Sequence, residues 1–424
     1  MKTAKKILAV LMCAAMIFGV MCVGAGAGYY SEGYYDGERG GWRENIRKKT
    51  VYPFTFEVYD ESEASVIRID KNAKGEITVP AKVDGVPVTE IHTAGAYEFV
   101  PDGCPNVTKI TLPDSITGIN YCAFSGFTKL EEISIPAGVE YIGWRAFENC
   151  SALRKITLPE GLEEIGEEAF LNCTSLEEFN IPSSVVSING SAFDNTAFYN
   201  NAFNREDGAL YRDGVLIAAE GISGKYSVKE GTRLIAMDSF RDCDYLYQLT
   251  LPASLRYISV GWATAFNALV GLERIKVNKA NPYYTADRQG VLYSKDRTVL
   301  VAFPYGFASV GYNVPNGVKR IETVLQGGYA TIFSLPKSVE YFCDIGDNVA
   351  LLAFDGTKEE FADIEGSEKL LCQIAEGERT VTVINKGDGG RSAIQATLLK
   401  ATISVVTIIY LPVVKLWSLL LRAN

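Results

Sequence analysis

The sequence contains a single histidine, His92, among its 424 residues. A Ser-His-Asp triad would have to use this residue, and a metal site built from several histidines is excluded. The sequence also lacks a Cys-x-x-Cys pair, a GxGxxG stretch and the EF-hand spacing of acidic residues. We therefore expect no catalytic, cofactor-binding or metal-binding residue, and the chain is not predicted to be an enzyme.

Positive charge is also in short supply, with 41 Lys and Arg against 51 Asp and Glu and a net charge of −10. Such a balance does not suggest a nucleic-acid partner. The N-terminus concentrates three lysines before an apolar run and the small residues Ala25-Gly26-Ala27. This pattern predicts a secretory signal peptide over residues 1–27, with a short membrane anchor as the alternative.

The nine cysteines do not form a disulfide framework. Cys13 and Cys22 lie in the predicted signal peptide, and the remaining seven are odd in number and unevenly spaced. Cys150 and Cys173 are 23 residues apart in two copies of Ala-Phe-x-Asn-Cys. Three interpretations are open for these two thiols: buried packing residues, a disulfide between neighbouring coils, or reactive groups. Since Phe127 holds the equivalent position in another unit, the sequence favours packing.

A 23-residue repeat organises the chain. Prolines 113, 136, 159 and 182 each end a short apolar run, and Ala-Phe pairs recur with the same step. One unit reads C-x2-L-x2-I-x-L-P-x2-L-x2-I-G-x2-A-F-x2-C from Cys150. The fragment L-x-x-I-x-L is the strand signature of leucine-rich repeats.

Each unit predicts one coil with three sides. Residues 153–158 form a short strand that Pro159 ends, and Leu162 and Ile165 supply a second inward segment. Ala169, Phe170 and Cys173 fill a third side on a tight helical turn. Stacked coils then bury a continuous core. The predicted structural core is Phe124, Phe147, Cys150, Phe170, Cys173, Phe193, Phe240 and Cys243.

The repeat unit I-P-x2-V-x2-I-G-x2-A-F-x2-C-x2-L resembles the BspA-like leucine-rich-repeat family (LRR_5 type) of bacterial and protist surface proteins. Two inserts, residues 208–219 and 286–304, are predicted β-hairpins and resemble that family's irregular repeats. Residues 353–364 resemble a segment often found near the end of such arrays. The resemblance implies an extended extracellular solenoid, often adhesive, without known catalytic residues.

The predicted fold is a β-rich leucine-rich-repeat solenoid with short strands, tight helical turns, hairpin inserts and a C-terminal hydrophobic helix. Ala401 to Leu421 is apolar apart from Lys415 and is long enough to span a membrane. An interfacial helix and a capping helix are its alternatives. The predicted divisions are signal peptide 1–27, Gly/Tyr-rich linker 28–50, N-terminal β cap 51–76, regular repeats 77–205, irregular repeats 206–365, tail 366–392 and hydrophobic segment 393–424.

Candidate ligand-binding residues lie at outward positions of the repeat. Tyr121 and Trp144 hold equivalent positions in adjacent units, and Tyr141 and Tyr257 share another. Exposed aromatic residues are enriched at recognition hot spots, although they can also shield the edges of coils. Glu163, Glu164, Glu167 and Glu168 also fall at outward positions, where solvated faces explain them better than a glycosidase carboxylate pair or a calcium site.

The sequence thus predicts an exported cell-surface binding protein that recognises a protein or glycan without a cofactor. A membrane tether through Ala401 to Leu421 would keep it at the cell surface. Two alternatives stay open: a carbohydrate-active enzyme that uses surface carboxylates, and a passive structural envelope protein.

Overall fold

The computed structural model describes residues 46–59, 62–92, 103–259, 266, 269–329, 331–375 and 381–385. These residues belong to two compact units. Unit 1 comprises the chain up to residue 246 together with residues 250–268, and unit 2 comprises residues 247–249 and the chain from residue 269. Each unit is described by itself below.

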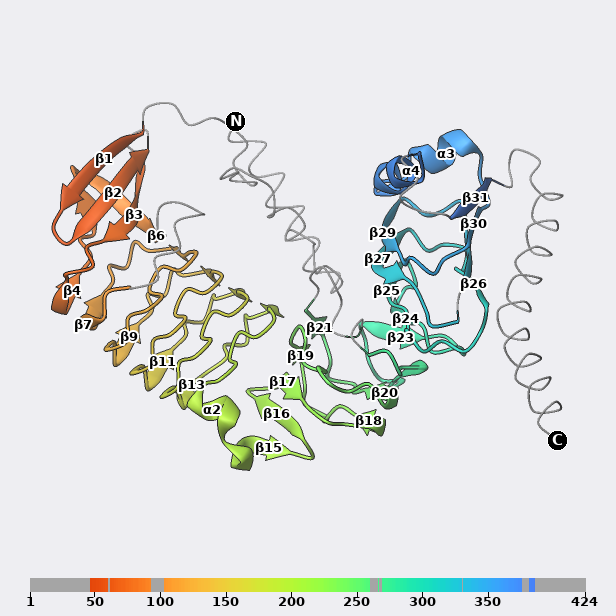
Figure 1. Ribbon diagram of the computed structural model, residues 1–424, viewed down its shortest axis with the longest axis horizontal. Coiled ribbons are helices and arrows are strands. Elements are labelled where there is room, and N and C mark those ends of the chain that lie inside the picture. Colours follow the sequence, from red (N-terminus) through yellow and green to blue (C-terminus); the bar gives the residue numbers. More distant parts are fainter. Residues whose placement is uncertain are drawn as a thin grey trace, which may run out of the picture. The chain divides into compact units, whose positions relative to one another are not determined.

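Short strands dominate unit 1 (Figure 1). They are β1 (Arg47–Val51), β2 (Phe54–Tyr59), β3 (Glu63–Ile69), β4 (Lys74–Thr78), β5 (Lys82–Val83), β6 (Val86–Ile91), β7 (Asn106–Thr111), β8 (Gly118–Ile119), β9 (Glu132–Ser134), β10 (Tyr141–Ile142), β11 (Lys155–Thr157), β12 (Glu164–Ile165), β13 (Glu178–Phe179), β14 (Ser187–Ile188), β15 (Arg205–Glu206), β16 (Ala209–Arg212), β17 (Val215–Ala219), β18 (Gly224–Ser227), β19 (Leu234–Ile235) and β21 (Tyr257–Ile258). Strand β20 (Leu246–Leu251) contains residues of both units.

Two parallel sheets form two sides of each regular coil. One has the order β13-β11-β9-β7-β4, and the other continues from β6 through β8, β10, β12 and β14. Ile156 pairs with Ile133 on one side and with Phe179 on the other, so the register advances by one repeat. The strands alternate exposed and buried residues, as in Lys155–Thr157, whose central isoleucine points inward. The predicted solenoid of short strands is confirmed.

The third side of the coil differs from the predicted helical turn. Residues 166–173 form successive tight turns with backbone bonds such as Cys173 N–H to Phe170 O, 3.1 Å. Alternate N–H groups instead donate to the next coil, as from Phe147 to Ala169 O at 2.8 Å. The physical reason is that two residues in each coil, Glu168 and Asn172 here, have φ of 56° and 61°. Left-handed residues interrupt a right-handed helix.

The interior of the coils is a column of aromatic rings. Phe147 and Phe170 stack with centroids 5.2 Å apart and planes 6° apart, and Phe170 and Phe193 continue the column at 5.3 Å. All eight predicted core residues are at most 1% exposed. Gly166 lets neighbouring coils approach closely, since a Cβ there would lie 2.7 Å from the carbonyl carbon of Gly143.

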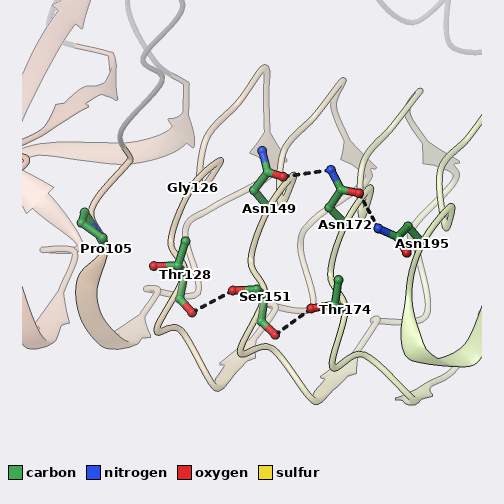
Figure 2. A pocket seen from close by; sticks show the side chains of 8 residues that line it. All are labelled: Pro105, Gly126, Thr128, Asn149, Ser151, Asn172, Thr174 and Asn195. Carbon is green, nitrogen blue, oxygen red and sulfur yellow. Dashed lines mark hydrogen bonds between the residues drawn. The ribbon is translucent and has the colours of Figure 1, made fainter.

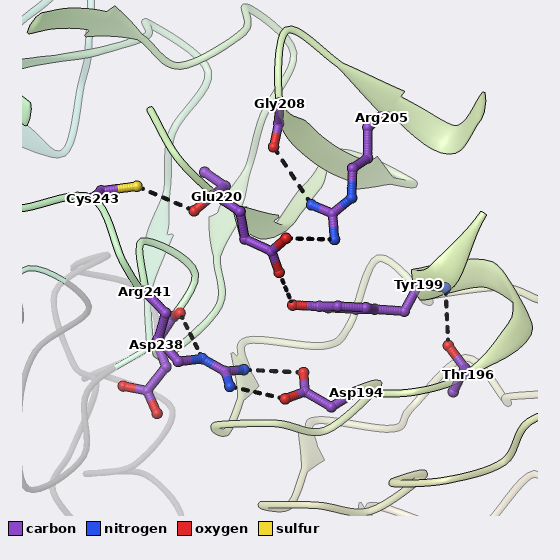
Figure 3. A network of polar contacts seen from close by, with 10 residues as sticks. Asp194, Thr196, Tyr199, Arg205, Gly208, Glu220, Asp238, Arg241 and Cys243 are labelled. Carbon is purple, nitrogen blue, oxygen red and sulfur yellow. Dashed lines mark hydrogen bonds and ion pairs between the residues drawn. The ribbon is translucent and has the colours of Figure 1, made fainter. Parts of the chain in front are cut away.

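The regular frame changes after Phe193. The chain forms one turn of helix α2 (Ala197–Asn200), capped by the Thr196 side chain, and the 3-10 turn η1 (Ala202–Asn204). The antiparallel pair β16 and β17 follows, which confirms the first predicted hairpin. A polar network fixes this change of frame (Figure 3). In this network, the two terminal nitrogens of the Arg241 guanidinium contact the carboxylate of Asp194, at 2.9 and 3.0 Å.

The same hairpin covers the end of a sheet. Arg212 donates to the carbonyl oxygen of Phe179 at the edge strand β13, with a distance of 2.9 Å from Nε. Asp213 Oδ2 accepts from the backbone N–H of Ile181 at 2.8 Å. The Arg212 guanidinium also lies over the rings of Phe179 and Phe198, 4.9 and 5.0 Å from their centroids. Side chains thus supply the bonds that another strand would have made.

The described residues of unit 2 form two further strand ladders and two helices. Its strands are β22 (Arg274–Val277), β23 (Tyr284–Ala286), β24 (Leu292–Ser294), β25 (Val299–Ala302), β26 (Gly311–Asn313), β27 (Arg320–Leu325), β28 (Ile332–Leu335), β29 (Tyr341–Ile345), β30 (Leu351–Phe354) and β31 (Thr382–Asn385). The sheets have the orders β23-β24-β25-β27-β29 and β26-β28-β30-β31. Strands β24 and β25 are antiparallel, which confirms the second predicted hairpin. Helices α3 (Lys358–Ala362) and α4 (Ser367–Ala375) precede β31.

Helix α3 begins with a capping box in which Thr357 and Glu360 each bond the other's backbone N–H. Within the described ranges, no helix has the length and apolarity needed to cross a membrane. The predicted signal peptide, most of the predicted linker, and the hydrophobic segment from Ala401 to Leu421 lie outside the described residues.

Candidate functional site

An exposed aromatic pair stands on two adjacent coils of unit 1. Tyr121 and Trp144 each lie two residues beyond a strand, β8 and β10 respectively. Their rings meet edge to face, with centroids 6.0 Å apart and an interplanar angle of 63°. Tyr121 is 44% exposed and Trp144 is half-buried. The structure therefore brings two of the four predicted ligand-binding residues together, and we call them the aromatic pair.

An arginine orders one face of the aromatic pair. The Arg145 guanidinium carbon lies 4.3 Å from the centroid of the Trp144 ring. Its Nε forms a close ion pair with Glu168 of the next coil, and Glu148 Oε2 lies 3.8 Å from the same nitrogen. A cation over an indole face is favourable, and the ion pair keeps the guanidinium in that position. Trp144 is thus fixed in orientation before any partner binds.

Two carboxylates, Glu163 and Glu167, continue the surface beside the aromatic pair. Glu167 holds the position of Trp144 in the following coil, and Glu163 lies above Glu140, to whose carbonyl its N–H donates at 2.7 Å. Partial burial and then the charge of Glu140 raise the pKa of Glu163. Partial burial and then Glu168 raise the pKa of Glu167. Both shifts arise first from partial burial, and the negative charge of neighbouring carboxylates adds to each.

The other two predicted ligand-binding residues have different surroundings. Tyr141 is half-buried and lies over Gly118 of the preceding coil, where an added Cβ would come within 2.6 Å of the tyrosine Cζ. Tyr257 belongs to a different sheet, packs against the hydrophobic core and lies beneath the Arg256 guanidinium, 4.9 Å from the ring centroid. These contacts favour shielding of coil edges for Tyr141 and Tyr257.

The cysteines of the repeat are free thiols inside the coils. Cys150 Sγ donates to Phe124 O and Cys173 Sγ to Phe147 O, both at 3.1 Å, so each thiol satisfies a carbonyl of the preceding coil. Burial, with Cys150 as a neighbour, raises the pKa of Cys173 well above its usual value. Cys150 and Cys173 are not joined by a disulfide in this structure. The buried, protonated thiol of Cys173 is poorly suited to nucleophilic chemistry.

A shallow groove of about 650 Å³, lined mostly by Asn, Ser and Thr residues, runs along the end of the turn segment near Asn172 (Figure 2). One wall is a row of side-chain amides in which Asn172 donates to Asn149 at 2.9 Å and Asn195 donates to Asn172 at 2.8 Å. The other wall is a row of hydroxyls, and Pro105 and Gly126 complete the lining. We call this surface the ladder groove, with an amide row of Asn149, Asn172 and Asn195 and a hydroxyl row of Thr128, Ser151 and Thr174.

The ladder groove was not predicted from the sequence. Its asparagines have φ of 62°, 61° and 56° and stand directly before the cysteine position of the repeat. The same position holds other residues with positive φ, namely Gly103, Gly126 and Asp242. A column restricted to Gly, Asn and Asp was the available signal, because these residues adopt the left-handed conformation most readily. Phe203, 98% exposed in η1, is an outward aromatic residue that sequence reasoning also missed.

The outward glutamates of the repeat lie away from the ladder groove. Glu163 and Glu167 are exposed, and neither lines the ladder groove. In the part of the chain that the structure describes, no three His, Cys, Asp or Glu side chains are grouped so as to hold a metal ion.

Comparisons with known proteins agree with the geometry of the coils. Residues 93–206 and 224–324, just over half of the chain, match the BspA-type leucine-rich-repeat region in six copies. None of the curated proteins matches the chain.

Solved structures with similarity to this chain include three bacterial proteins. A leucine-rich cell-surface protein from Faecalibacterium prausnitzii is 17% identical, over 76% of this chain and 98% of its own, with a TM-score of 0.31. The leucine-rich-repeat protein of T. pallidum is 24% identical, over 49% and 86%, with a TM-score of 0.33. The pneumococcal vaccine antigen PcpA is 17% identical, over 72% of each chain, with a TM-score of 0.27. Because the repeat model matches just over half of its residues, this chain belongs to the BspA-type leucine-rich-repeat family.

Proposed function

We propose that this protein is an exported cell-surface protein that binds a partner protein through the outward side chains of its coils, in an adhesive or recognition role. The observation that supports this function best is the aromatic pair, an exposed Tyr121 ring edge-on to Trp144. Aromatic residues dominate binding energy at interfaces when a rigid scaffold presents them. Here the scaffold is the stacked phenylalanine column beneath. Leucine-rich-repeat proteins commonly use such extended surfaces for protein binding.

The charge around the aromatic pair favours a positively charged partner. Glu163 and Glu167 lie on the same side of the coils with raised pKa values, and the chain carries a net charge of −10. A lysine or arginine of the partner would contact the aromatic rings and offset this negative charge. Binding should therefore weaken as the salt concentration rises.

The test compares the full mature chain with a Tyr121→Ala/Trp144→Ala variant. Surface proteins captured by the parent chain are identified by mass spectrometry, and the affinity for the purified candidate is measured. We expect the double variant to bind at least about tenfold more weakly, because a hot-spot aromatic contributes about 2 kcal/mol or more. Tyr245→Ala is the matched control, since Tyr245 is 82% exposed on another coil. Equal affinity of the double variant and the parent, with both folded, would reject the aromatic pair as the binding site.

Export and anchoring are separate proposals that depend on the ends of the chain. We propose that residues 1–27 are removed during export and that Ala401 to Leu421 tethers the protein to a membrane. Cells that express the full chain are compared with cells that express a chain ending at Ser392. Release of the shorter chain alone into the medium supports the tether, whereas equal release of both chains rejects it.

The rival functions require features that the described residues offer weakly. A glycosidase needs two carboxylates about 5–10 Å apart across a cleft, but Glu163 and Glu167 are exposed on the outer side of the coils. A passive spacer would present a polar outer surface without clustered aromatics, and Tyr121 with Trp144 departs from that expectation.

A further inference from the structure

The amide row keeps unused hydrogen-bonding capacity. Asn172 uses one N–H toward Asn149 and accepts one bond from Asn195. A primary amide has two N–H donors and an oxygen with two lone pairs, so each interior amide retains one donor and one acceptor. Asn149 and Asn195 are exposed and Asn172 is half-buried, which leaves this capacity within reach of a ligand. The amide row thus repeats a donor and an acceptor at every coil.

The hydroxyl row complements the amide row in its hydrogen-bonding groups. Ser151 Oγ donates to the carbonyl oxygen of Thr128 at 3.3 Å, and Thr174 Oγ1 donates to that of Ser151 at 3.5 Å (Figure 2). A hydroxyl has a single O–H, so the donors of Ser151 and Thr174 are used within the protein and their oxygen lone pairs remain as acceptors. The two walls of the ladder groove therefore offer a mixed donor and acceptor row opposite a row of acceptors.

The fold does not by itself demand asparagine in the amide row. Gly103, Gly126 and Asp242 hold the equivalent position in other coils with φ of 37°, 75° and 59°. Three consecutive asparagines therefore supply more than the backbone conformation requires. The extra property is the continuous row of amides along one wall.

The lining of the ladder groove contains no ionisable side chain. A charged ligand would lose hydration there without gaining a counter-charge, which disfavours anions and cations. An extended peptide is a poor match, since its residues rise about 3.3 Å whereas adjacent coils are about 4.8 Å apart. A neutral ligand rich in hydroxyls fits better, because each hydroxyl is both a donor and an acceptor and can pair with either wall.

We propose that the ladder groove binds a neutral oligosaccharide chain that lies along the two rows. This site is independent of the protein-binding proposal, since neither residue of the aromatic pair lines the groove. The contacts would be hydrogen bonds from sugar hydroxyls to the Asn172 and Asn195 amides and to the Ser151 and Thr174 oxygens.

The test titrates the full mature chain with neutral oligosaccharides of glucose, xylose and mannose, and with a sulfated heparin oligosaccharide and an uncharged extended peptide as comparisons. Binding is measured by calorimetry. The key variant is Asn172→Gly, which removes the amide but keeps a residue that adopts the positive φ, as Gly126 does in its own coil. Asn172→Asp keeps the shape and adds a charge. Asn72→Ala, at an exposed asparagine outside the groove, is the matched control.

We expect at least one neutral oligosaccharide to bind, and Asn172→Gly and Asn172→Asp to weaken it about tenfold, as the loss of a ligand hydrogen bond does. Asn72→Ala and the Tyr121→Ala/Trp144→Ala variant should bind the sugar as the parent does. That last result separates the two proposals, because the double variant would lose only the protein partner. Absence of binding to every neutral oligosaccharide, binding of only the heparin or peptide probe, or unchanged affinity in Asn172→Gly would overturn the proposal.

Discussion

The Asp213 carboxylate accepts a hydrogen bond from the backbone N–H of Ile181 at 2.8 Å, beside the Arg212 guanidinium that donates to the Phe179 carbonyl. Together these neighbours in sequence act on the edge of a sheet more than thirty residues before them. An uncovered strand edge exposes backbone groups that can pair with another chain. Arg212 and Asp213 therefore protect the last regular coil.

Removal of this edge protection should both destabilise the protein and promote association. We expect Asp213→Ala to lower the free energy of unfolding by about 1–3 kcal/mol, since the Ile181 N–H loses its partner near a buried side chain. Urea denaturation gives the stability, and light scattering gives the association. Asp207→Ala is the control, at an exposed residue that precedes the same hairpin. Stability and scattering equal to the parent in Asp213→Ala would contradict this role.

The phenylalanine column predicts a large effect at its centre. Phe170 is fully buried between Phe147 and Phe193, with centroids 5.2 and 5.3 Å away. We expect Phe170→Ala to cost about 3–5 kcal/mol, as for large-to-small changes in close-packed cores. Chemical denaturation measures the cost. Phe203→Ala, at a residue 98% exposed, should leave stability nearly unchanged. A similar loss in both variants would argue against the column as the stabilising element.

Ser239 is an exception within the repeat. It holds the position of Ala146 and Ala169, is 1% exposed, and its hydroxyl has no hydrogen-bond partner among the described residues. A buried hydroxyl without a partner costs about 1–3 kcal/mol. We therefore expect Ser239→Ala to raise the melting temperature, and the reciprocal Ala169→Ser to lower it. The prediction fails if Ser239→Ala is less stable than the parent.

Alkaline pH should weaken the first regular coil through Cys104. This thiol is 2% exposed, and burial followed by the charge of Asp70 raises its pKa to about 12. In the unfolded chain the thiol ionises near its ordinary value of 9.0, so the unfolded state binds fewer protons above that pH. The stabilising contribution is complete below pH 9.0 and is lost between pH 9.0 and about 12.

The measurement is the free energy of unfolding at several pH values under reducing conditions. We expect the decline above pH 9.0 to be shallower in Cys104→Ala than in the parent, even though the variant has lower stability at neutral pH. Cys372→Ala, at an exposed thiol, should decline as the parent does. An unchanged slope in Cys104→Ala would show that this thiol does not contribute to the loss.

The sequence predicted the parts of the coil that depend on buried side chains. Phe147, Cys150 and the strand before Pro159 recur in a fixed frame because the core requires apolar residues at those points. The pattern of apolar residues did not reveal the turn geometry, since a positive φ at Glu168 and Asn172 does not require an apolar residue there. For the position of Asn172, the column of Gly, Asn and Asp carried that information instead.

The sequence also did not predict contacts between residues that are far apart in the chain. Arg212 reaches Phe179 because the hairpin folds back on the last regular coil, and Arg241 reaches Asp194 from the coil that follows the hairpin. Neither pair follows from the 23-residue step. The aromatic pair was identified because Tyr121 and Trp144 do follow it, whereas Tyr141 and Tyr257 share a repeat position but belong to different sheets.

The amide row also sets the length of the ladder groove in steps of one coil. Asn172 and Asn195 each donate to the asparagine of the coil before them, so the row has one direction and would grow by a single asparagine for each added coil. Duplication of residues 150–172 would insert one complete cassette and lengthen both walls by one step without altering their chemistry. The groove can therefore change length only in whole coils. A gene that gains or loses a repeat would change the length of ligand that the groove can contact.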